Sequence, residues 1–371
     1  MGEGKNKRKN KRKGWKEIGV KKNLKGIVIA GPTGVGKTDL SIKLAKEINS
    51  EIISADASQI YKELNIGTAK ISPKEMQGVK HYMIDVADPC SDYSVGDFEK
   101  EVNKILFEKE NNLESKNKNI MLVGGTGLYI KSITDGFANL PPKNEKIREE
   151  LSSKSLEELQ EILKDLDKKS YNEIDLFNKL RLIRAIEVCY LTNGKFSELR
   201  IKNIKNNNYK FLKIFLTRDR NELYDRINKR VDIMISKGLI NEARKIYDKY
   251  KKSLYKISSI GYKELFLYFD GKITLEEAIE EIKKESRRYA KRQMTWFRKE
   301  KNYITYNLSE ISENEIIKDI KRNGNEGIGK LEPLKHELNG YWSRRITDKH
   351  RFIYKLTETS ILVIACANHH K

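Results

Sequence analysis

Cysteine is scarce in this chain. Cys90, Cys189 and Cys366 are the only three among 371 residues, they lie far apart, and none belongs to a CxxC pair. This usage excludes a disulfide framework and predicts a reducing, cytoplasmic setting. Long apolar runs are missing as well, because no stretch reaches the roughly 18 apolar residues that a membrane-spanning helix needs. The N-terminus lacks the apolar segment of a secretory signal. We therefore expect a cytoplasmic protein without a membrane partner.

Acidic residues are outnumbered. Lys and Arg total 74 against 53 Asp and Glu, which gives a formal net charge of +21. Such an excess favours a polyanionic partner, because binding one releases counterions; a charged surface in a lysine-rich proteome is the alternative. Residues 1–25 carry 11 of the basic side chains and few apolar ones. We expect a disordered basic arm there, which either adds non-specific RNA affinity or is a solvated tail.

Alternating strand and helix patterns predict an α/β fold. Hydrophobic residues make up 38% of the chain, enough for packed cores, and the length predicts two or three domains. Short apolar runs predict strands at 26–30, 51–54, 120–123 and 212–216. Helical spacing is found at 40–48, 98–107, 143–191, 222–250, 275–298 and 313–321. We therefore expect a parallel sheet with crossover helices.

The chain divides into segments of different character. The stretch 143–191 has no strand signal and predicts a helical insertion domain. After residue 321, a Gly-rich turn and two β-like runs, 351–356 and 361–365, predict a small, partial α+β segment. The predicted division is a basic arm (1–25), an α/β domain in two pieces (26–142 and 192–318), the helical insertion (143–191) and the C-terminal segment (319–371).

A phosphate-binding loop opens the α/β domain. The segment 31–38 reads GPTGVGKT, which fits G-x-x-x-x-G-K-[ST], and it follows a predicted strand and opens a helix. Its glycines let backbone N–H groups approach phosphate oxygens, and the helix dipole favours an anion. Lys37 supplies a positive charge and Thr38 a hydroxyl ligand for Mg²⁺. The motif predicts a P-loop that binds a diphosphate-bearing ligand, which need not be ATP. Its residues are Gly31, Pro32, Thr33, Gly34, Val35, Gly36, Lys37 and Thr38.

Two further segments end predicted strands at the carboxyl edge of the same sheet, which lines the ligand crevice in doubly wound folds. The run ISADASQIY places Asp56 just beyond a strand, and LVGGTGLY places a glycine turn around Thr126. An Asp in such a position is more often a helix cap than a catalytic base. Neither segment identifies a reaction by itself.

Taken in order, these motifs closely resemble the bacterial tRNA dimethylallyltransferases, also called isopentenyltransferases, from about Gly26 to about Ile320. The matching segments are GPTGVGKT, ISADASQIYKELNIGTAK, LVGGTGLYIKS, RLIRAIEV with TNGKFSE, ELYDRINKRVDIMI, SIGYKEL and RRYAKRQMTWFRK. The resemblance implies transfer of a dimethylallyl group from dimethylallyl diphosphate to the N6 amine of the adenine 3′ of the anticodon, position 37. It also implies Mg²⁺, a monomer, and the anticodon stem-loop of tRNA as partner.

The resemblance assigns roles to individual residues. Asp56 would take a proton from the adenine amine, Thr126 would lie near the reacting groups, and Arg230 would join Lys37 and Thr38 on the diphosphate. The tRNA contacts that it implies are Asp56, Ala57, Ser58, Gln59, Thr126, Arg148, Leu180, Arg181, Leu182, Ile183 and Arg184. Family members usually have Ser and a bulky residue where this chain has Ala57 and Ser58, and a polar or basic residue in place of Leu180.

The C-terminal segment has a second resemblance, to the RelE/YoeB-like toxins, which are ribosome-dependent mRNA endonucleases. The similar residues begin at Ile316 and include EGIGKLEPLKH and GYWSRRITDKHRFIY. The first strand and first long helix of the toxin pattern are missing, and Ala367, Asn368 and His370 replace Arg, Tyr and Tyr. We therefore expect no nuclease activity, and a ribosome or antitoxin partner only for a functional tail. The roles implied are Glu332 as base, Arg351 as phosphate stabiliser and His369 as acid, with Lys335 and Arg345 assisting.

Two other functions stay open. A P-loop kinase of nucleosides or small metabolites would share the loop and the sheet, but would not need the segment AKRQMTWFR. An RNA-binding or toxin-like regulator would act through the tail. A labelling experiment distinguishes a transferase from a kinase: a transferase moves label from dimethylallyl diphosphate to tRNA, and a kinase moves it from the γ-phosphate of ATP to a metabolite. Truncation before residue 316 distinguishes a transferase from a regulator that acts through the tail, since transferase activity should survive it.

Overall fold

The computed structural model describes residues 25–111, 119–138, 140–202 and 210–322, together with four C-terminal strands at 332–333, 342–345, 350–356 and 361–368. The predicted basic arm lies outside these residues except for Lys25, which begins the first strand. Of the toxin-like residues, Lys335 and His369 also lie outside them. No helix in these ranges is both long and apolar enough to cross a membrane.

The central sheet has six strands in the order β3-β2-β4-β1-β5-β6, and every neighbouring pair is parallel. The predicted α/β class and its four strands are confirmed. The sequence missed β3, which has only two residues, and β6, an edge strand with one buried side chain, Tyr306. The strand bounds are β1 Lys25–Ala30, β2 Ser50–Ala55, β3 His81–Tyr82, β4 Asn119–Gly124, β5 Lys210–Thr217 and β6 Tyr303–Asn307.

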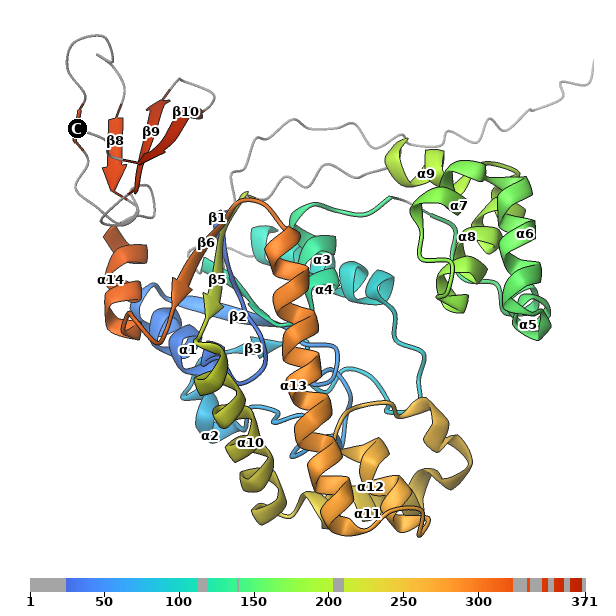
Figure 1. Ribbon diagram of the computed structural model, residues 1–371. Coiled ribbons are helices and arrows are strands. Elements are labelled where there is room, and N and C mark those ends of the chain that lie inside the picture. Colours follow the sequence, from blue (N-terminus) through green and yellow to red (C-terminus); the bar gives the residue numbers. More distant parts are fainter. Residues whose placement is uncertain are drawn as a thin grey trace, which may run out of the picture.

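Helices cover both faces of this sheet (Figure 1). Adjacent residues of β1 point into different cores: Ile29 packs with Leu40 of α1, and Val28 packs with Phe98 of α3. Apolar side chains on both faces explain why the central strands read as short apolar runs. The helices of this part are α1 Lys37–Glu47, α2 Pro73–Met76, α3 Val95–Asn111, α4 Gly127–Thr134, α10 Arg220–Ser236, α13 Leu275–Lys299 and α14 Glu313–Arg322.

A third core lies where α10 and α13 meet α11 (Leu239–Tyr250), the 3₁₀ turn η1 (Lys251–Lys256) and α12 (Tyr262–Phe269). We call the part around this third core the lower lobe; it comprises α11, η1, α12, the end of α10 and the start of α13. The helical pattern predicted at 222–250 is in fact two helices. Gly238, with φ of 97°, separates α10 from α11, because glycine adopts this left-handed conformation without steric cost.

The five helices α5–α9 form a group of their own to one side of the sheet (Figure 1). They bury Leu151, Leu159, Leu163 and Leu182 in a separate core. As predicted, the stretch 143–191 is helical and contains no described strand. The group continues past residue 191, because Ser197 of α9 donates two hydrogen bonds to the buried Asp167. The bounds are α5 Glu145–Ser153, α6 Leu156–Leu166, α7 Lys168–Glu173, α8 Lys179–Thr192 and α9 Phe196–Lys202.

The C-terminal strands form a second sheet, antiparallel and ordered β10-β9-β8-β7. Their bounds are β7 Glu332–Pro333, β8 Trp342–Arg345, β9 His350–Leu356 and β10 Ile361–Asn368. The two predicted β-like runs are confirmed as β9 and β10, and the other two strands were missed.

Candidate active site

The phosphate loop joins β1 to α1, and its backbone requires glycine. Gly34 and Gly36 have φ values of 79° and 113°, which only glycine adopts readily. A side chain on Gly31 would come within 2.9 Å of the Leu216 carbonyl. Gly36 is the N-cap of α1 and supplies no side-chain cap, so the first N–H groups of the helix are available to an anion. The local geometry is that of an anion-binding loop.

Two cations lie at this loop. Nζ of Lys37 folds back and donates to the carbonyls of Gly31 and Pro32, both at 2.9 Å. Burial lowers the pKa of Lys37 to about 8; the nearby Asp56 carboxylate opposes this shift and Arg230 adds to it. Burial also lowers the pKa of Arg230, again opposed by Asp56. Two partly desolvated cations facing one carboxylate leave an excess of positive charge that a diphosphate would neutralise.

Asp56 follows β2 and uses its two carboxylate oxygens differently. Oδ1 accepts hydrogen bonds from the backbone N–H groups of Ser58 (2.9 Å) and Gln59 (3.4 Å). Oδ2 has no hydrogen-bond partner within the described part of the chain. Asp56 therefore caps no helix; its Oδ1 closes the turn at residues 57–60, and its Oδ2 is left for a ligand.

Thr126 and Gln293 tie the loops around Asp56 together. The Ala57 N–H donates to Oγ1 of Thr126 at 3.0 Å, which joins the ends of β2 and β4. Gln293, on α13, accepts from the Thr33 N–H at 2.8 Å and donates to the Gly125 carbonyl at 2.9 Å. It links the P-loop to the glycine turn after β4. The sequence reading missed Gln293, although it lies inside the motif AKRQMTWFR.

Thr33, Asp56 and Arg230 line a cavity of about 430 Å³. Its polar lining also includes Tyr289. Burial raises the pKa of Tyr289 to about 12, so its phenol stays protonated at neutral pH. The apolar side chains in the lining are Ile227, Val231, Met234, Ile260 and Ile282. A cavity lined by both charged and apolar side chains suits a ligand with a diphosphate and a hydrocarbon group.

A smaller space of about 50 Å³ lies next to it, lined by Lys37, Thr38, Asp56, Gln59 and His81 among others. Asp56 therefore borders both spaces. His81 was not predicted as a site residue. Its Nδ1 lies 2.8 Å from the Val79 carbonyl, and burial lowers its pKa, so the neutral ring keeps its Nε2 as an acceptor.

The predicted tRNA contacts outside this cavity lie in the α5–α9 group. Arg148 and Arg184 both form ion pairs with the fully buried carboxylate of Glu187. The side chains of Leu182 and Ile183 are buried in the helical core, so they cannot form a contact surface. The predicted stretch is corrected on this point, because only one face of α8 is free. Leu180, which is 78% exposed, lies on that face with Arg181.

The predicted toxin-like residues are only partly described. Glu332 is in β7 and Arg351 is in β9, with β8 between them. Arg345 of β8 is directly opposite Arg351 in the strand register. The expectation that these residues and His369 do not form an active nuclease site stays a prediction.

Residues 59–300 match the family model of the IPP transferases. The tRNA dimethylallyltransferase of Fusobacterium nucleatum is 53% identical over 296 residues, which cover 80% of this chain and 96% of that protein. The chain belongs to the IPP transferase family. The tRNA dimethylallyltransferase of Clostridioides difficile is another relative, 45% identical over 311 residues that cover 81% of this chain and 98% of that enzyme. The resemblance inferred from the motifs is confirmed.

Solved IPP transferase structures agree with this fold. The tRNA isopentenylpyrophosphate transferase of Bacillus halodurans aligns with a TM-score of 0.60 and 40% identity, covering 81% of this chain and 95% of that one. A eukaryotic dimethylallyltransferase acting on tRNA aligns with a TM-score of 0.68 and 26% identity, covering 85% and 82%.

The tail matches a second family. Residues 293–370 fit the model of the YoeB-like toxins of bacterial type II toxin–antitoxin systems, which confirms the second resemblance. The motifs predicted a start at Ile316. The family match begins earlier, at residue 293, and takes in the end of α13, β6 and α14. The two family matches of this IPP transferase therefore overlap at residues 293–300.

Proposed function

We propose that this protein transfers the dimethylallyl group of dimethylallyl diphosphate to the N6 amine of adenine 37 in tRNA, releasing diphosphate. One observation carries the proposal. In an IPP transferase framework, Asp56 borders two spaces: a small one lined by the P-loop residues Lys37 and Thr38, and a cavity lined by Arg230 and by several apolar side chains. The cations suit the diphosphate, and the apolar side chains suit the five-carbon group.

The leaving group is the first requirement of this reaction. Diphosphate departs readily once its developing charge is stabilised by fixed donors. Lys37, Arg230 and the N–H groups at the start of α1 supply these donors. Lys37 is already held over the loop by two carbonyls, so little reorganisation is needed when the diphosphate binds.

The residues present fit a magnesium ion. The Thr38 hydroxyl borders the small space beside Lys37, and a hard oxygen donor of this kind suits Mg²⁺. The described residues contain no cluster of three or more His, Cys, Asp or Glu that could hold a metal. This agrees with an ion coordinated mainly by substrate phosphates and water. When bound, Mg²⁺ would neutralise diphosphate charge.

The adenine amine is the second requirement. It is a weak nucleophile, because its lone pair is delocalised into the ring. Confining the amine and the allylic carbon in one cavity gains at most about 7–11 kcal/mol from proximity. As the N6–C bond forms and the C–O bond to diphosphate breaks, Oδ2 of Asp56 takes the amine proton. The adenine must leave its stack in the tRNA to reach the cavity.

The tRNA itself would extend beyond the cavity. We propose that the anticodon stem-loop contacts the exposed face of α8 with Leu180, Arg181 and Arg184, together with Arg148 of α5. The ion pairs with Glu187 fix both arginine side chains in place and leave donors for phosphates. We further propose a monomer in the cytoplasm, with the α5–α9 group, which extends the predicted 143–191 to α9, acting as a separate tRNA-binding domain.

Nucleoside analysis tests the function directly. Unmodified tRNA is incubated with the protein, Mg²⁺ and dimethylallyl diphosphate, then digested. We expect N6-dimethylallyladenosine, mapped to position 37. If instead no modified nucleoside forms and the γ-phosphate of ATP is transferred to a nucleoside or metabolite, the proposal is wrong and the protein is a P-loop kinase.

A further inference from the structure

The loop 56–70 carries Asp56 at one end and forms a wall of the cavity through Tyr61, Gly67 and Thr68. We call it the base loop. It follows β2 of the sheet and packs through Leu64 into the core of the lower lobe, whose Val231, Met234 and Ile282 also line the cavity. The placement of the loop relative to the lobe must be held constant if the amine, Asp56 and the allylic carbon are to meet.

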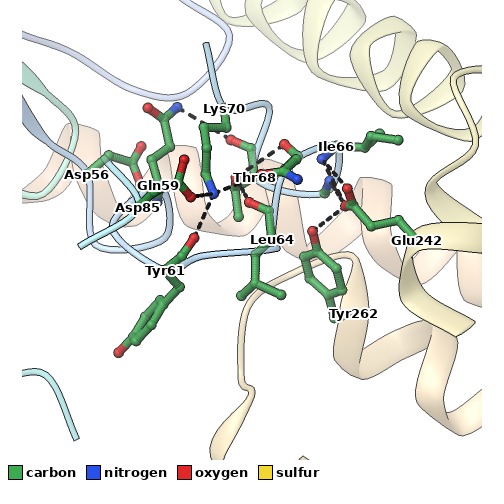
Figure 2. Close-up of polar contacts among 12 residues, drawn as sticks. Asp56, Gln59, Tyr61, Leu64, Ile66, Thr68, Lys70, Asp85, Glu242 and Tyr262 are labelled. Atoms are coloured by element: carbon green, nitrogen blue, oxygen red, sulfur yellow. Dashed lines mark hydrogen bonds and ion pairs between the residues drawn. The ribbon is translucent and has the colours of Figure 1, made fainter. Parts of the chain in front are cut away.

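The base loop is braced along its length, as Figure 2 shows. Gln59 donates from Nε2 to the Ala69 carbonyl at 3.2 Å. Lys70 donates from Nζ to the Tyr61 carbonyl (2.6 Å) and to Oδ1 of Asn65 (2.9 Å), and it also pairs with Asp85. These bonds join the two ends of the loop, so a displacement at its tip is carried to Asp56.

One carboxylate of the lower lobe accepts hydrogen bonds from the backbone at the tip of the loop (Figure 2). Oε1 of Glu242, on α11, accepts from the Ile66 N–H at 2.8 Å, the Gly67 N–H at 3.2 Å and the Tyr262 hydroxyl at 2.5 Å. Its Oε2 lies 3.1 Å from the Ile66 nitrogen. Glu242 has no ion pair with any Lys or Arg among the described residues, so its partners there are the two amides and the phenol.

The fit around this carboxylate is close. Tyr262 is fully buried, and burial together with Glu242 raises its pKa, so the phenol stays a donor. Gly67 lies against the Tyr262 ring: a side chain on it would come within 2.5 Å of the ring and 3.0 Å of Leu239. The contact therefore tolerates little sliding between loop and lobe.

We propose that Glu242 is a positioning residue, which fixes the base loop to the lower lobe and so sets the placement of Asp56 relative to the bound substrates. The inference rests on the proposed function. Glu242 does not line the cavity, and it acts only through the backbone of Ile66 and Gly67.

Glu242→Ala is the main test, with Glu63→Ala as a matched control. Glu63 is also on the base loop and also reaches α11, through an exposed bond with Lys249 (2.6 Å) and a partly buried one with Tyr250 (3.1 Å). In Glu242→Ala we expect kcat to fall by about 10- to 100-fold, because a misplacement near 1 Å costs that much. The KM for dimethylallyl diphosphate should change less than threefold. Glu63→Ala should keep kcat within about twofold of wild type, since exposed ion pairs contribute little.

Glu242→Gln keeps an acceptor oxygen at the same place and should recover most of kcat, which a general loss of packing would not predict. Hydrogen exchange of the Ile66 and Gly67 amides provides a readout that does not require activity. Exchange should accelerate in Glu242→Ala and stay unchanged in Glu63→Ala. Wild-type exchange at both amides in Glu242→Ala, or wild-type kcat in that variant, overturns the inference. A wild-type protein that does not prenylate tRNA overturns the proposed function instead, and the exchange result still decides whether Glu242 holds the loop.

Discussion

Arg230 donates a hydrogen bond from Nη1 to Oγ1 of Thr33 at 3.4 Å, across 197 positions of sequence. This contact brings the guanidinium of α10 onto the P-loop, beside Lys37. A P-loop alone presents its cations from one side of a phosphate group. Here a second cation comes from the lower lobe, so the bound diphosphate would contact both halves of the site.

Replacing Arg230 or Lys37 by Ala should therefore weaken use of dimethylallyl diphosphate. A hydrogen bond to a charged group contributes about 1.5–3 kcal/mol, so kcat/KM for the diphosphate should fall by about 10- to 100-fold. The affinity for tRNA, measured by filter binding, should stay within about twofold. Lys229→Ala, an exposed residue on the same helix, is the control and should behave as wild type. A loss of tRNA affinity without a change in diphosphate kinetics would reverse the assignment.

Asp56→Asn should remove the base and keep the turn. The amide oxygen can still accept from the Ser58 N–H, as Oδ1 does now, but neither amide atom takes up a proton at neutral pH. We expect the single-turnover rate constant to fall by roughly 10²- to 10⁴-fold, with the Kd for tRNA little changed. Near-normal turnover would exclude Asp56 as the base.

Removal of Mg²⁺ should stop transfer without releasing tRNA. Chelation leaves the diphosphate charge to Lys37 and Arg230 alone. Thr38→Ala should raise the Mg²⁺ concentration needed for half-maximal rate, and Thr38→Ser, which keeps the hydroxyl, should not. The measurement is a magnesium titration of the transfer rate. Full activity after exhaustive chelation would show that the metal is not required.

Gln293→Ala should destabilise the protein as well as slow it. The substitution leaves the Thr33 N–H and the Gly125 carbonyl without their present partner in a site that is 5% exposed. Each buried polar group left unsatisfied costs about 1–3 kcal/mol. Urea unfolding should therefore report a lower free energy of unfolding than for the exposed control Thr295→Ala. An unchanged unfolding midpoint would mean that water replaces the amide without loss.

The parts of this site that could be predicted are those with local causes. The P-loop requires positive φ at Gly34 and Gly36, and the glycines that meet this requirement belong to one short continuous motif. The buried central strands read as apolar runs because both of their faces are covered. Glu242 and Gln293 could not be found in this way, since their partners lie 176 and 260 positions distant. Only the packing of α11 and α13 brings them to the site. Leu182 and Ile183 were misassigned because a motif does not tell which face of a helix is buried.

The last prediction concerns the C-terminal tail, whose removal must start after residue 322 and not at residue 316. Truncation before residue 316, suggested by the motifs, would remove Ile316, Ile317 and Ile320, which α14 buries in the core of the sheet domain. Burying each such side chain contributes about 1.5–3 kcal/mol. We therefore expect loss of residues 316–371 to destabilise the transferase.

Removal of residues 323–371 spares α14 and should leave prenyl transfer and the melting temperature close to those of the full chain. The isolated segment 306–371 should not arrest growth when expressed, because it omits residues 293–305 of the toxin family match and a nuclease needs its acid, base and phosphate contact in fixed geometry. Comparison of the two truncations by thermal melting and tRNA nucleoside analysis checks the first expectation. Growth arrest by segment 306–371 that is relieved by His369→Ala would contradict the second, and would assign a ribonuclease activity to the tail.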